Sequence, residues 1–218
     1  MDTAAVAFDL DDTLAVTGVD RETLLSEALA AVGAPPRSRE AYLSAHADNL
    51  TARSREPVFE RLLDGVEAVE AADLARAYRE RVNASLTPVP GVEALLATLR
   101  ERYRVGLLTN GPVVAQRSKL RALGWTGAFD ATLVTGELSA GKPDRTAFDA
   151  LVDRLDVHRE ATVYVGDDVD ADVRGATAAG LDAVQVCYPG GPSPDPDAVA
   201  HVDRSELADR LPAILAER

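Results

Sequence analysis

Residues 8–14 read FDLDDTL and continue the apolar run 4–8 into an acidic turn. Asp9, Asp11 and Asp12 stand within four positions, where their like charges repel. The apolar run predicts a buried strand, and open α/β sheets bind their ligands at the carboxyl ends of such strands. Clustered carboxylates in that place need a proton or a cation, so we expect a hard metal ion such as Mg²⁺.

Two other interpretations of this stretch compete with a magnesium site. An acidic turn on a solvated surface would also place charge after a strand. A calcium loop would require Gly at the position of Leu14, and the similar stretch DDVDADV at 167–173 lacks both that Gly and the terminal Glu. We therefore exclude calcium and keep the surface turn as the alternative.

Short β-branched apolar runs recur along the chain and alternate with helical patterns. The runs predict buried parallel strands at 4–8, 104–109, 131–135, 162–166 and 183–186. Helices are predicted at about 113–123, 145–155, 170–179 and 205–216. This alternation predicts an α/β fold whose core is a Rossmann-like, doubly wound parallel sheet.

The interval 16–88 breaks the alternation, because it contains helical patterns and no convincing strand. It is too long to be a loop. We therefore predict a small α-helical domain at 16–88, inserted after the first strand of an α/β core formed by 1–15 and 89–218. Pro90 and Gly91 are expected to open the helix that returns the chain to the sheet.

Polar groups also follow the second strand, 104–109. Thr109, Asn110 and Gly111 offer a hydroxyl and turn amides that can face a phosphate oxygen, although this triplet is usually a plain turn. Further on, Lys142 is one of two lysines in a chain that otherwise uses arginine. A compact ammonium is indicated there, because the planar fork of arginine is not equivalent, with an ordinary surface lysine as the alternative.

A second acidic cluster follows the strand predicted at 162–166. Asp167, Asp168 and Asp172 stand directly after the apolar run. Helix N-capping explains one carboxylate of this kind, but not three. The cluster therefore indicates a cation for the same reason as the first.

The composition of the chain limits its partners. The 218 residues carry 36 acidic and 23 basic side chains, a net charge of −13, so neither nucleic acid nor a membrane surface is an expected partner. No signal peptide or membrane-spanning stretch is recognisable, so we expect a cytoplasmic protein, monomer or dimer. The acidity and the scarcity of lysine are typical of halophilic proteins, with GC-rich codon usage as the alternative. The lone Cys187 is expected to be a small buried side chain.

Four stretches resemble, in order, the four motifs of the haloacid dehalogenase-like hydrolases: FDLDDTL, LLTNG, GKPD and VGDDVDAD. The resemblance spans almost the whole chain, and the helical insert is similar to the α-helical cap of that family. It implies a Mg²⁺-dependent phosphatase that hydrolyses a small phosphate monoester, a phosphorylated metabolite, through an aspartyl-phosphate intermediate.

The resemblance also implies a role for each matching residue. Asp9 would be the nucleophile and Asp11 the general acid and base, with nearby carboxylates favouring the protonated form of Asp11. Lys142 would offset negative charge on Asp9 and on the phosphoryl group. Thr109 and the amides of Asn110 and Gly111 would hold phosphate oxygens.

The implied metal site uses both acidic stretches. Mg²⁺ would be bound by the carboxylates of Asp9 and Asp167 and by the backbone carbonyl of Asp11. Asp168 would be a further ligand or a supporting group, and Asp172 would orient Lys142. Thr13 would brace the loop of the first motif by hydrogen bonding.

Three alternative functions were compared with the phosphatase. Dehalogenases of the same family lack the second aspartate and an essential metal, so Asp11 and the second acidic cluster disfavour them. Phosphomutases retain both aspartates and stay open. A phospho-receiver module, which is not an enzyme, places its paired acids and its acceptor on different strands and carries no helical insert.

The substrate itself is not predicted by any motif in 16–88. Five polar or aromatic residues of this segment are candidates to face the active site, and for each of them we expect a solvated helical face instead. These residues are Tyr42, His46, Asn49, Arg53 and Arg55.

Overall fold

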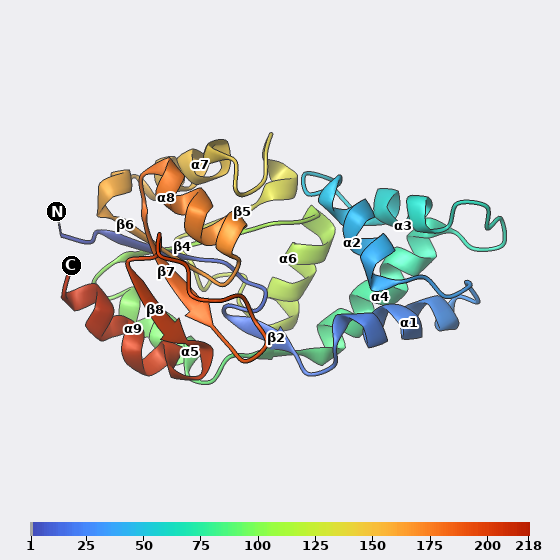
Figure 1. The fold of residues 1–218 in the computed structure, drawn as a ribbon, viewed down its shortest axis with the longest axis horizontal. Helices are drawn as coiled ribbons and strands as arrows, with labels where there is room; N and C mark the ends of the chain where they lie inside the picture. Colours follow the sequence, from blue (N-terminus) through green and yellow to red (C-terminus); the bar gives the residue numbers. More distant parts are fainter. Residues whose placement is uncertain (1) are drawn as a thin grey trace.

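The computed structural model describes residues 2–218, and at its centre lies a six-stranded parallel sheet (Figure 1). In spatial order the strands are β5 (Ala131–Val134), β4 (Arg104–Thr109), β1 (Ala5–Phe8), β6 (Thr162–Gly166), β7 (Asp182–Cys187) and β8 (Ala200–Asp203). β1 pairs with β4 on one side and with β6 on the other. The chain first extends the sheet to β5 and then, from β6, toward β8, so the direction of winding reverses beside β1. Ligands of doubly wound sheets bind at such a switch point.

Helices cover both faces of this sheet. They are α5 (Val92–Leu99), α6 (Val113–Ala122), α7 (Arg145–Leu155), α8 (Gly175–Ala179) and α9 (Leu207–Ala216). On one face α5 and α9 pack with Val6 and Phe8, and on the other α7 and α8 pack with Ala5 and Ala7 (Figure 1). The alternation arises because successive side chains of a strand point to opposite faces. The predicted doubly wound α/β fold is confirmed.

The segment between β1 and α5 contains a separate bundle of four helices (Figure 1). They are α1 (Arg21–Ala31), α2 (Arg39–Ala47), α3 (Glu56–Leu62) and α4 (Ala71–Ser85). These helices share a hydrophobic cluster of their own, in which Leu25, Phe59 and Tyr78 are almost completely buried. We refer to α1–α4 as the helical bundle.

A short two-stranded link joins the helical bundle to the sheet. β2 (Ala15–Thr17) and β3 (Leu86–Pro88) pair antiparallel where the chain leaves and re-enters the core. The prediction of no strand in 16–88 is wrong at both edges of the interval, where these two strands lie. Three residues are too few to show a strand period, which is why the pattern was missed.

Three further details differ from the prediction. β8 was not predicted, because Val202 is its one buried side chain. The helix predicted at 170–179 is divided into a π-helical turn, Val169–Arg174, and the short α8. Cys187, at the end of β7, is half-buried rather than buried.

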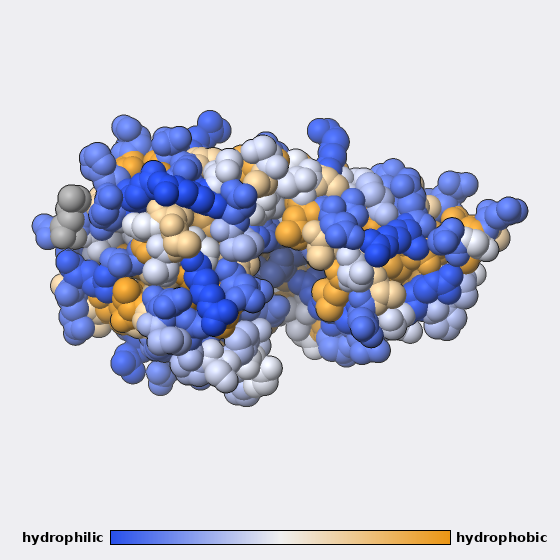
Figure 2. All heavy atoms as spheres, turned by 45° about the horizontal axis from the view of Figure 1, so that its top comes forward, coloured by the Kyte–Doolittle hydropathy of each residue, from blue (hydrophilic) through white to orange (hydrophobic). Residues whose placement is uncertain are grey.

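The surface is hydrophilic over most of the face shown in Figure 2, and it is hollowed where the sheet-bearing part meets the helical bundle. Across residues 2–218, none of the helices has both the length and the apolar character required to cross a membrane. The carboxyl ends of β1, β4 and β6 lie on the side of the sheet that faces the helical bundle. The sequence-predicted site residues lie there.

Candidate active site

Asp9 stands at the carboxyl end of β1, where its backbone N–H donates to the carbonyl oxygen of Val165 at 2.9 Å. This hydrogen bond continues the pairing with β6 and fixes the direction of the side chain. The side chain is buried, and the ammonium of Lys142 donates to Asp9 Oδ1 at 2.7 Å. Burial raises the pKa of Asp9 to about 7 against the opposing charge of Lys142, and Asp172 adds to the rise.

Lys142 is almost completely buried, and its ammonium group donates to three acceptors. These are Asp9 Oδ1 at 2.7 Å, Asp172 Oδ1 at 2.6 Å and the hydroxyl oxygen of Tyr164 at 2.8 Å. Burial opposes the charge of Lys142, but the carboxylates of Asp172 and Asp9 raise its pKa well above the usual value. Lys142 is therefore a fixed cation, with all three of its protons directed at acceptors.

The loop that carries Lys142 is held in place by Asn110. The side-chain amide of Asn110 donates to the Lys142 carbonyl and accepts from the Lys142 N–H, both at 2.9 Å. This pair of hydrogen bonds connects the end of β4 to the lysine loop. The side chain of Asn110 thus positions Lys142, a role that the sequence analysis had not considered.

Asp167 follows β6 and completes a compact group of acids. Thr13 Oγ1 donates to Asp167 Oδ1 at 2.9 Å, which ties the first acidic stretch to the second. Within residues 2–218, the one group of potential ligands close enough to share a metal ion is Asp9, Asp167 and Asp172, whose oxygens lie within 4.8 Å of one another. Burial, reinforced by Asp9 and Asp172, raises the pKa of Asp167 to about 8. A divalent cation would remove this repulsion.

Asp172 is buried, and its Oδ1 accepts from the ammonium of Lys142. Its second oxygen accepts from the backbone N–H of Asp168 at 3.1 Å. Gly166 permits this close approach, because a Cβ atom at that position would lie 2.4 Å from the carboxyl group of Asp172. Asp168 itself has an exposed side chain that caps the π-helical turn by accepting from the N–H of Ala171 at 2.8 Å. Asp168 therefore lies outside the group of three acids.

Asp11 has surroundings opposite to those of Asp9, because cations and an amide contact both of its oxygens. Arg21 donates to Oδ1 at 2.8 Å, while Lys119 and Gln116 donate to Oδ2. Burial alone would raise the pKa of Asp11, but Lys119 and Arg21 hold it well below the usual range. The expectation that nearby carboxylates favour the protonated form was wrong for this conformation, because the groups that contact Asp11 are donors.

Lys119 is a functional candidate to which the sequence analysis gave no role. It lies on α6 with a side chain only 2% exposed, and burial lowers its pKa to about 8 although Asp11 opposes that effect. Each of the two lysines of the chain thus contacts an aspartate of FDLDDTL. Lysine is as rare at position 119 as at position 142. This rarity, which made Lys142 a candidate, could also have identified Lys119.

The second predicted motif is only partly free to bind phosphate in this conformation. Thr109 Oγ1 accepts a hydrogen bond from Gln116 at 2.6 Å and keeps its own proton to donate. The N–H of Gly111 donates to Thr135 Oγ1 at 3.0 Å. This contact corrects the expectation that the Gly111 amide faces a phosphate oxygen, because its donor is already in use.

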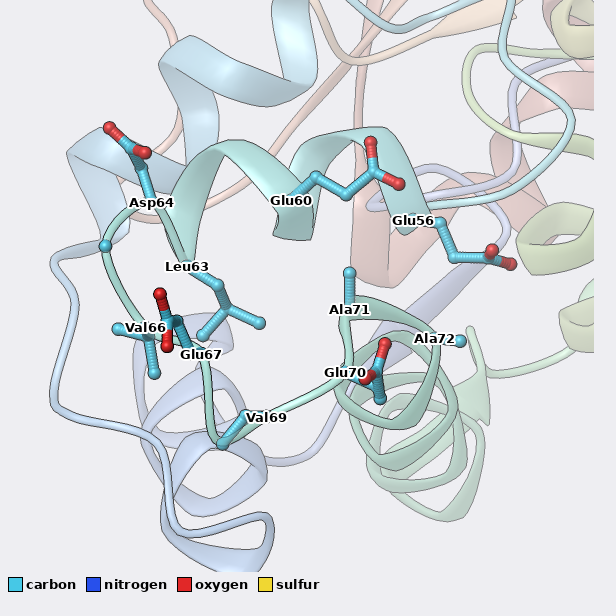
Figure 3. Close-up of a pocket in the computed structure, with 11 residues that line it drawn as sticks. Glu56, Glu60, Leu63, Asp64, Val66, Glu67, Val69, Glu70, Ala71 and Ala72 are labelled. Atoms are coloured by element: carbon cyan, nitrogen blue, oxygen red, sulfur yellow. The ribbon is translucent and has the colours of Figure 1, made fainter.

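A cavity of about 300 Å³ lies over these residues. Its lining includes Asp9, Thr109, Lys142 and Asp167 from the core, together with Leu43 and His46 of α2. A larger cavity, of about 480 Å³, lies beside the loop between α3 and α4 (Figure 3). Its carboxylates do not converge on one point (Figure 3), and none of them belongs to the acidic cluster at the strand ends.

Comparison with known proteins identifies the family of this chain. Residues 3–180 match the model of a hydrolase family. That family is the haloacid dehalogenase-like hydrolases, and the chain belongs to it. The family expected from the four motifs is confirmed.

Individual relatives differ in the reactions for which they are named. A phosphoserine phosphatase of Thermus thermophilus is 39% identical over 150 residues, which cover 66% of this chain but only 59% of that protein. A phosphoglycolate phosphatase of Cereibacter sphaeroides is 34% identical over 185 residues, 81% of each chain. A crystal structure of a 2-haloacid dehalogenase from Pseudomonas syringae pv. Tomato is 30% identical, with a TM-score of 0.72 and 99% of both chains covered.

Proposed function

We propose that the protein is a Mg²⁺-dependent phosphatase that hydrolyses a small phosphate monoester through an aspartyl-phosphate on Asp9. The observation that carries the proposal is the buried Asp9, held by Lys142 and grouped with Asp167 and Asp172. The phosphatase names of the two curated relatives support the same reaction. The substrate is then a small phosphorylated metabolite.

The reaction divides between Asp9 and Asp11. A carboxylate oxygen of Asp9 attacks phosphorus, the bond from phosphorus to the leaving oxygen breaks, and Asp11 gives that oxygen a proton. In the second half, water attacks phosphorus, its proton passes to Asp11, and the bond between phosphorus and Asp9 breaks. Asp11 must leave its contacts with Lys119 and Arg21 to act as the acid, because those cations favour its ionised form.

The residues present fit a magnesium ion. Mg²⁺ prefers carboxylate oxygens, and Asp9 and Asp167 offer them within the one compact acidic group found in residues 2–218. The raised pKa values of these two acids reflect their burial and the repulsion among the carboxylates, which a cation would offset. Both oxygens of Asp172 accept hydrogen bonds, from Lys142 and from the N–H of Asp168, whereas Lys142 contacts only Oδ1 of Asp9. We therefore assign the metal to Asp9 and Asp167, with the carbonyl of Asp11 as third protein ligand. The ion would supply positive charge that offsets the phosphate oxygens.

One similar structure favours a dehalogenase as the alternative function, but the acidic residues of the site argue against it. The crystal structure with 30% identity is that of a 2-haloacid dehalogenase. Its name describes displacement at carbon, which requires no second acid and no metal-binding carboxylates. Here Asp11 stands two positions after Asp9, and Asp167 lies with Asp9 in a compact acidic group. We therefore place phosphatase first, with a phosphomutase as the second candidate.

We further propose that the helical bundle, residues 16–88, acts as the cap of the active site and that 1–15 and 89–218 form the catalytic core. Leu43 and His46 of α2 line the cavity over Asp9, which supports this division. We also propose that the protein is cytoplasmic and halophilic, and the net charge of −13 supports adaptation to salt. Its oligomeric state, monomer or dimer, stays a prediction.

The Asp9→Asn variant tests the proposed function. It should lose phosphatase turnover by roughly 10⁴-fold or more, as removal of a nucleophile does elsewhere. Turnover of p-nitrophenyl phosphate with Mg²⁺ measures the loss, and mass spectrometry excludes deamidation back to Asp. Asp168→Asn is the matched control, because its exposed carboxylate caps a turn outside the acidic group. Near-normal turnover by a correctly folded Asp9→Asn variant would rule out the assigned nucleophile.

A further inference from the structure

A second cavity, of about 160 Å³, adjoins the one over Asp9. Its lining includes Arg39, Tyr42, Arg55, Tyr78 and Lys119. Asp11, Asp12 and His46 line both cavities, so the two spaces meet around Asp11. Because Asp11 is the group that protonates the leaving oxygen in the proposed reaction, the second cavity lies where the leaving group would extend.

The second cavity concentrates positive charge in a protein that is strongly acidic. Arg21 and Lys119 are paired with Asp11. Across residues 2–218, neither Arg39 nor Arg55 forms an ion pair. Their guanidinium groups lie over the rings of Tyr42 and Tyr78 instead, at 5.0 Å and 5.4 Å from the ring centres. Although the chain has 36 acidic side chains, none within residues 2–218 forms an ion pair with these two arginines.

Unused hydrogen-bond donors identify the kind of ligand. Arg55 is only 8% exposed, and its Nε atom is buried without a hydrogen-bond partner. Arg39 Nη1 is also buried and unpartnered. Leaving charged donors in this state is costly, unless a ligand supplies the acceptors. The planar fork of arginine suits carboxylate and phosphate oxygens.

We propose that Arg55 and Arg39, assisted by Lys119, bind a second anionic group on the leaving group of the substrate. This inference rests on the proposed phosphatase function and specifies its substrate class: a compact phosphate monoester that also carries a carboxylate or a second phosphate. The cavity is large enough for a compact leaving group, since a cavity of about 150 Å³ holds one benzene molecule. A short hydroxy acid fits the volume of about 160 Å³.

Matched substrates test the proposal. 2-Phosphoglycolate and its neutral amide, 2-phosphoglycolamide, differ in the charge of the distal group, and ethylene glycol bisphosphate carries a phosphate there instead. Wild-type kcat/KM should favour the acid over the amide by about 10- to 100-fold, the effect expected for charged hydrogen bonds. Arg55→Met should lower that ratio several-fold, mainly through a higher KM for the acid, because only Arg39 and Lys119 remain to bind the distal anion. The bisphosphate shows which of the two anions is preferred.

Arg53→Met is the matched control, because Arg53 is a nearby arginine with an exposed side chain that lines neither cavity. It should keep the wild-type ratio. Arg39→Met provides a second variant if Arg55→Met does not fold, as judged by thermal unfolding. Equal wild-type rates for the acid, the bisphosphate and the amide would overturn the proposal, and so would a ratio that survives both substitutions. If the wild-type enzyme turns over neither these three substrates nor p-nitrophenyl phosphate, the result would instead reject the phosphatase function.

Discussion

Asp9 and Asp11 are two residues apart in the sequence but lie in opposite electrostatic surroundings. Asp9 is buried among carboxylates with Lys142 as its cation, and its pKa is raised to about 7. Asp11 lies among donors from α1 and α6, and its pKa is lowered. In this conformation both shifts are opposite to the proposed roles, because a nucleophile must be ionised and a general acid must hold a proton. A cation beside Asp9 would favour its ionised form, and Asp11 must separate from Lys119 and Arg21 before it can hold a proton.

Replacement of the proposed acid should affect substrates unequally. Asp11→Asn removes the proton that the leaving oxygen needs, which general acid catalysis makes worth about 10²- to 10⁴-fold. An alkyl phosphate should lose this full factor, and p-nitrophenyl phosphate should lose less, because nitrophenolate leaves without a proton. Single-turnover phosphorylation of Asp9 by a series of substrates measures the effect. An equal loss across leaving groups would count against the acid role.

The residues that could be predicted from the sequence are those that follow strands. Asp9, Asp167 and Lys142 stand in stretches whose spacing is visible in the chain, and the structure brings them together. Lys119 and Arg55 lie within ordinary helical or loop sequence, and their role depends on packing between α6 and the helical bundle. Local periodicity carries no information on such a contact, so a solvated face was the wrong expectation for Arg55 and for Tyr42, both of which are buried.

At the scale of elements, the acidic group exists because separate strand ends converge. Asp9 follows β1 and Asp167 follows β6, and these strands are neighbours in the sheet. Asp172 reaches the same point from the π-helical turn, where Gly166 leaves room for it. The pairing of these strands holds the acids close to one another. Folding therefore works against the repulsion of these carboxylates.

This repulsion predicts a pH-dependent effect of Mg²⁺ on stability. The pKa values of Asp9 and Asp167, about 7 and about 8 in the folded state, lie above their ordinary value of 3.8. Between pH 4 and 8 these two acids therefore hold more protons in the folded state than in the unfolded state, and their contribution to metal-free stability falls as pH rises. Mg²⁺ binds the ionised acids, so it should raise the unfolding midpoint more at pH 8 than at pH 5, by at least about 4 °C.

Calorimetry at several pH values, with Mg²⁺ or with a chelator, measures the difference between the two curves. Other carboxylates of the protein contribute equally to both curves and cancel. Asp167→Asn removes one of the two raised groups and should reduce the pH dependence of the Mg²⁺ effect. The same increase in midpoint at pH 5 and pH 8 would show that these acids do not hold the ion.

The elements themselves differed in how far they could be predicted. The buried strands β1, β4 and β6 have continuous apolar sequences, so their place in the sheet followed from the pattern. β8 buries one side chain, and β2 is a three-residue strand that pairs with β3, so neither carries a period. Their formation is decided by tertiary pairing. The pairing of β2 with β3 places the helical bundle beside the active site.

The whole molecule combines an acidic exterior with a cationic interior cavity. The net charge of −13 repels a phosphorylated substrate at long range. Arg39, Arg55 and Lys119 act within the cavity, where the low dielectric strengthens short-range attraction. Salt screens the long-range repulsion more than these buried contacts. The balance of the two should therefore shift toward binding as ionic strength rises.

The same balance predicts that stability rises with salt. The Debye length falls from about 10 Å at 0.1 M to about 3 Å at 1 M, so molar KCl screens the 36 acidic side chains from one another. Salt also weakens exposed ion pairs such as Arg174–Asp170, but each of these contributes only about 0–1 kcal/mol. Because acidic groups exceed basic ones by 36 − 23 = 13, repulsion dominates and its screening should raise the unfolding midpoint.

Thermal unfolding from dilute buffer to molar KCl, at fixed Mg²⁺ and protein concentration, tests this expectation. Non-specific salting-out also stabilises proteins, so the control is the same titration with a variant in which exposed acids far from the active site, such as Glu67 and Glu70, are replaced by glutamine. Removal of these charges should raise the midpoint in dilute buffer and reduce its dependence on KCl. If the midpoint is flat or falls with salt, the acidity has no role in salt adaptation, while the assignments of Asp9 and Arg55 are unaffected because they rest on buried contacts.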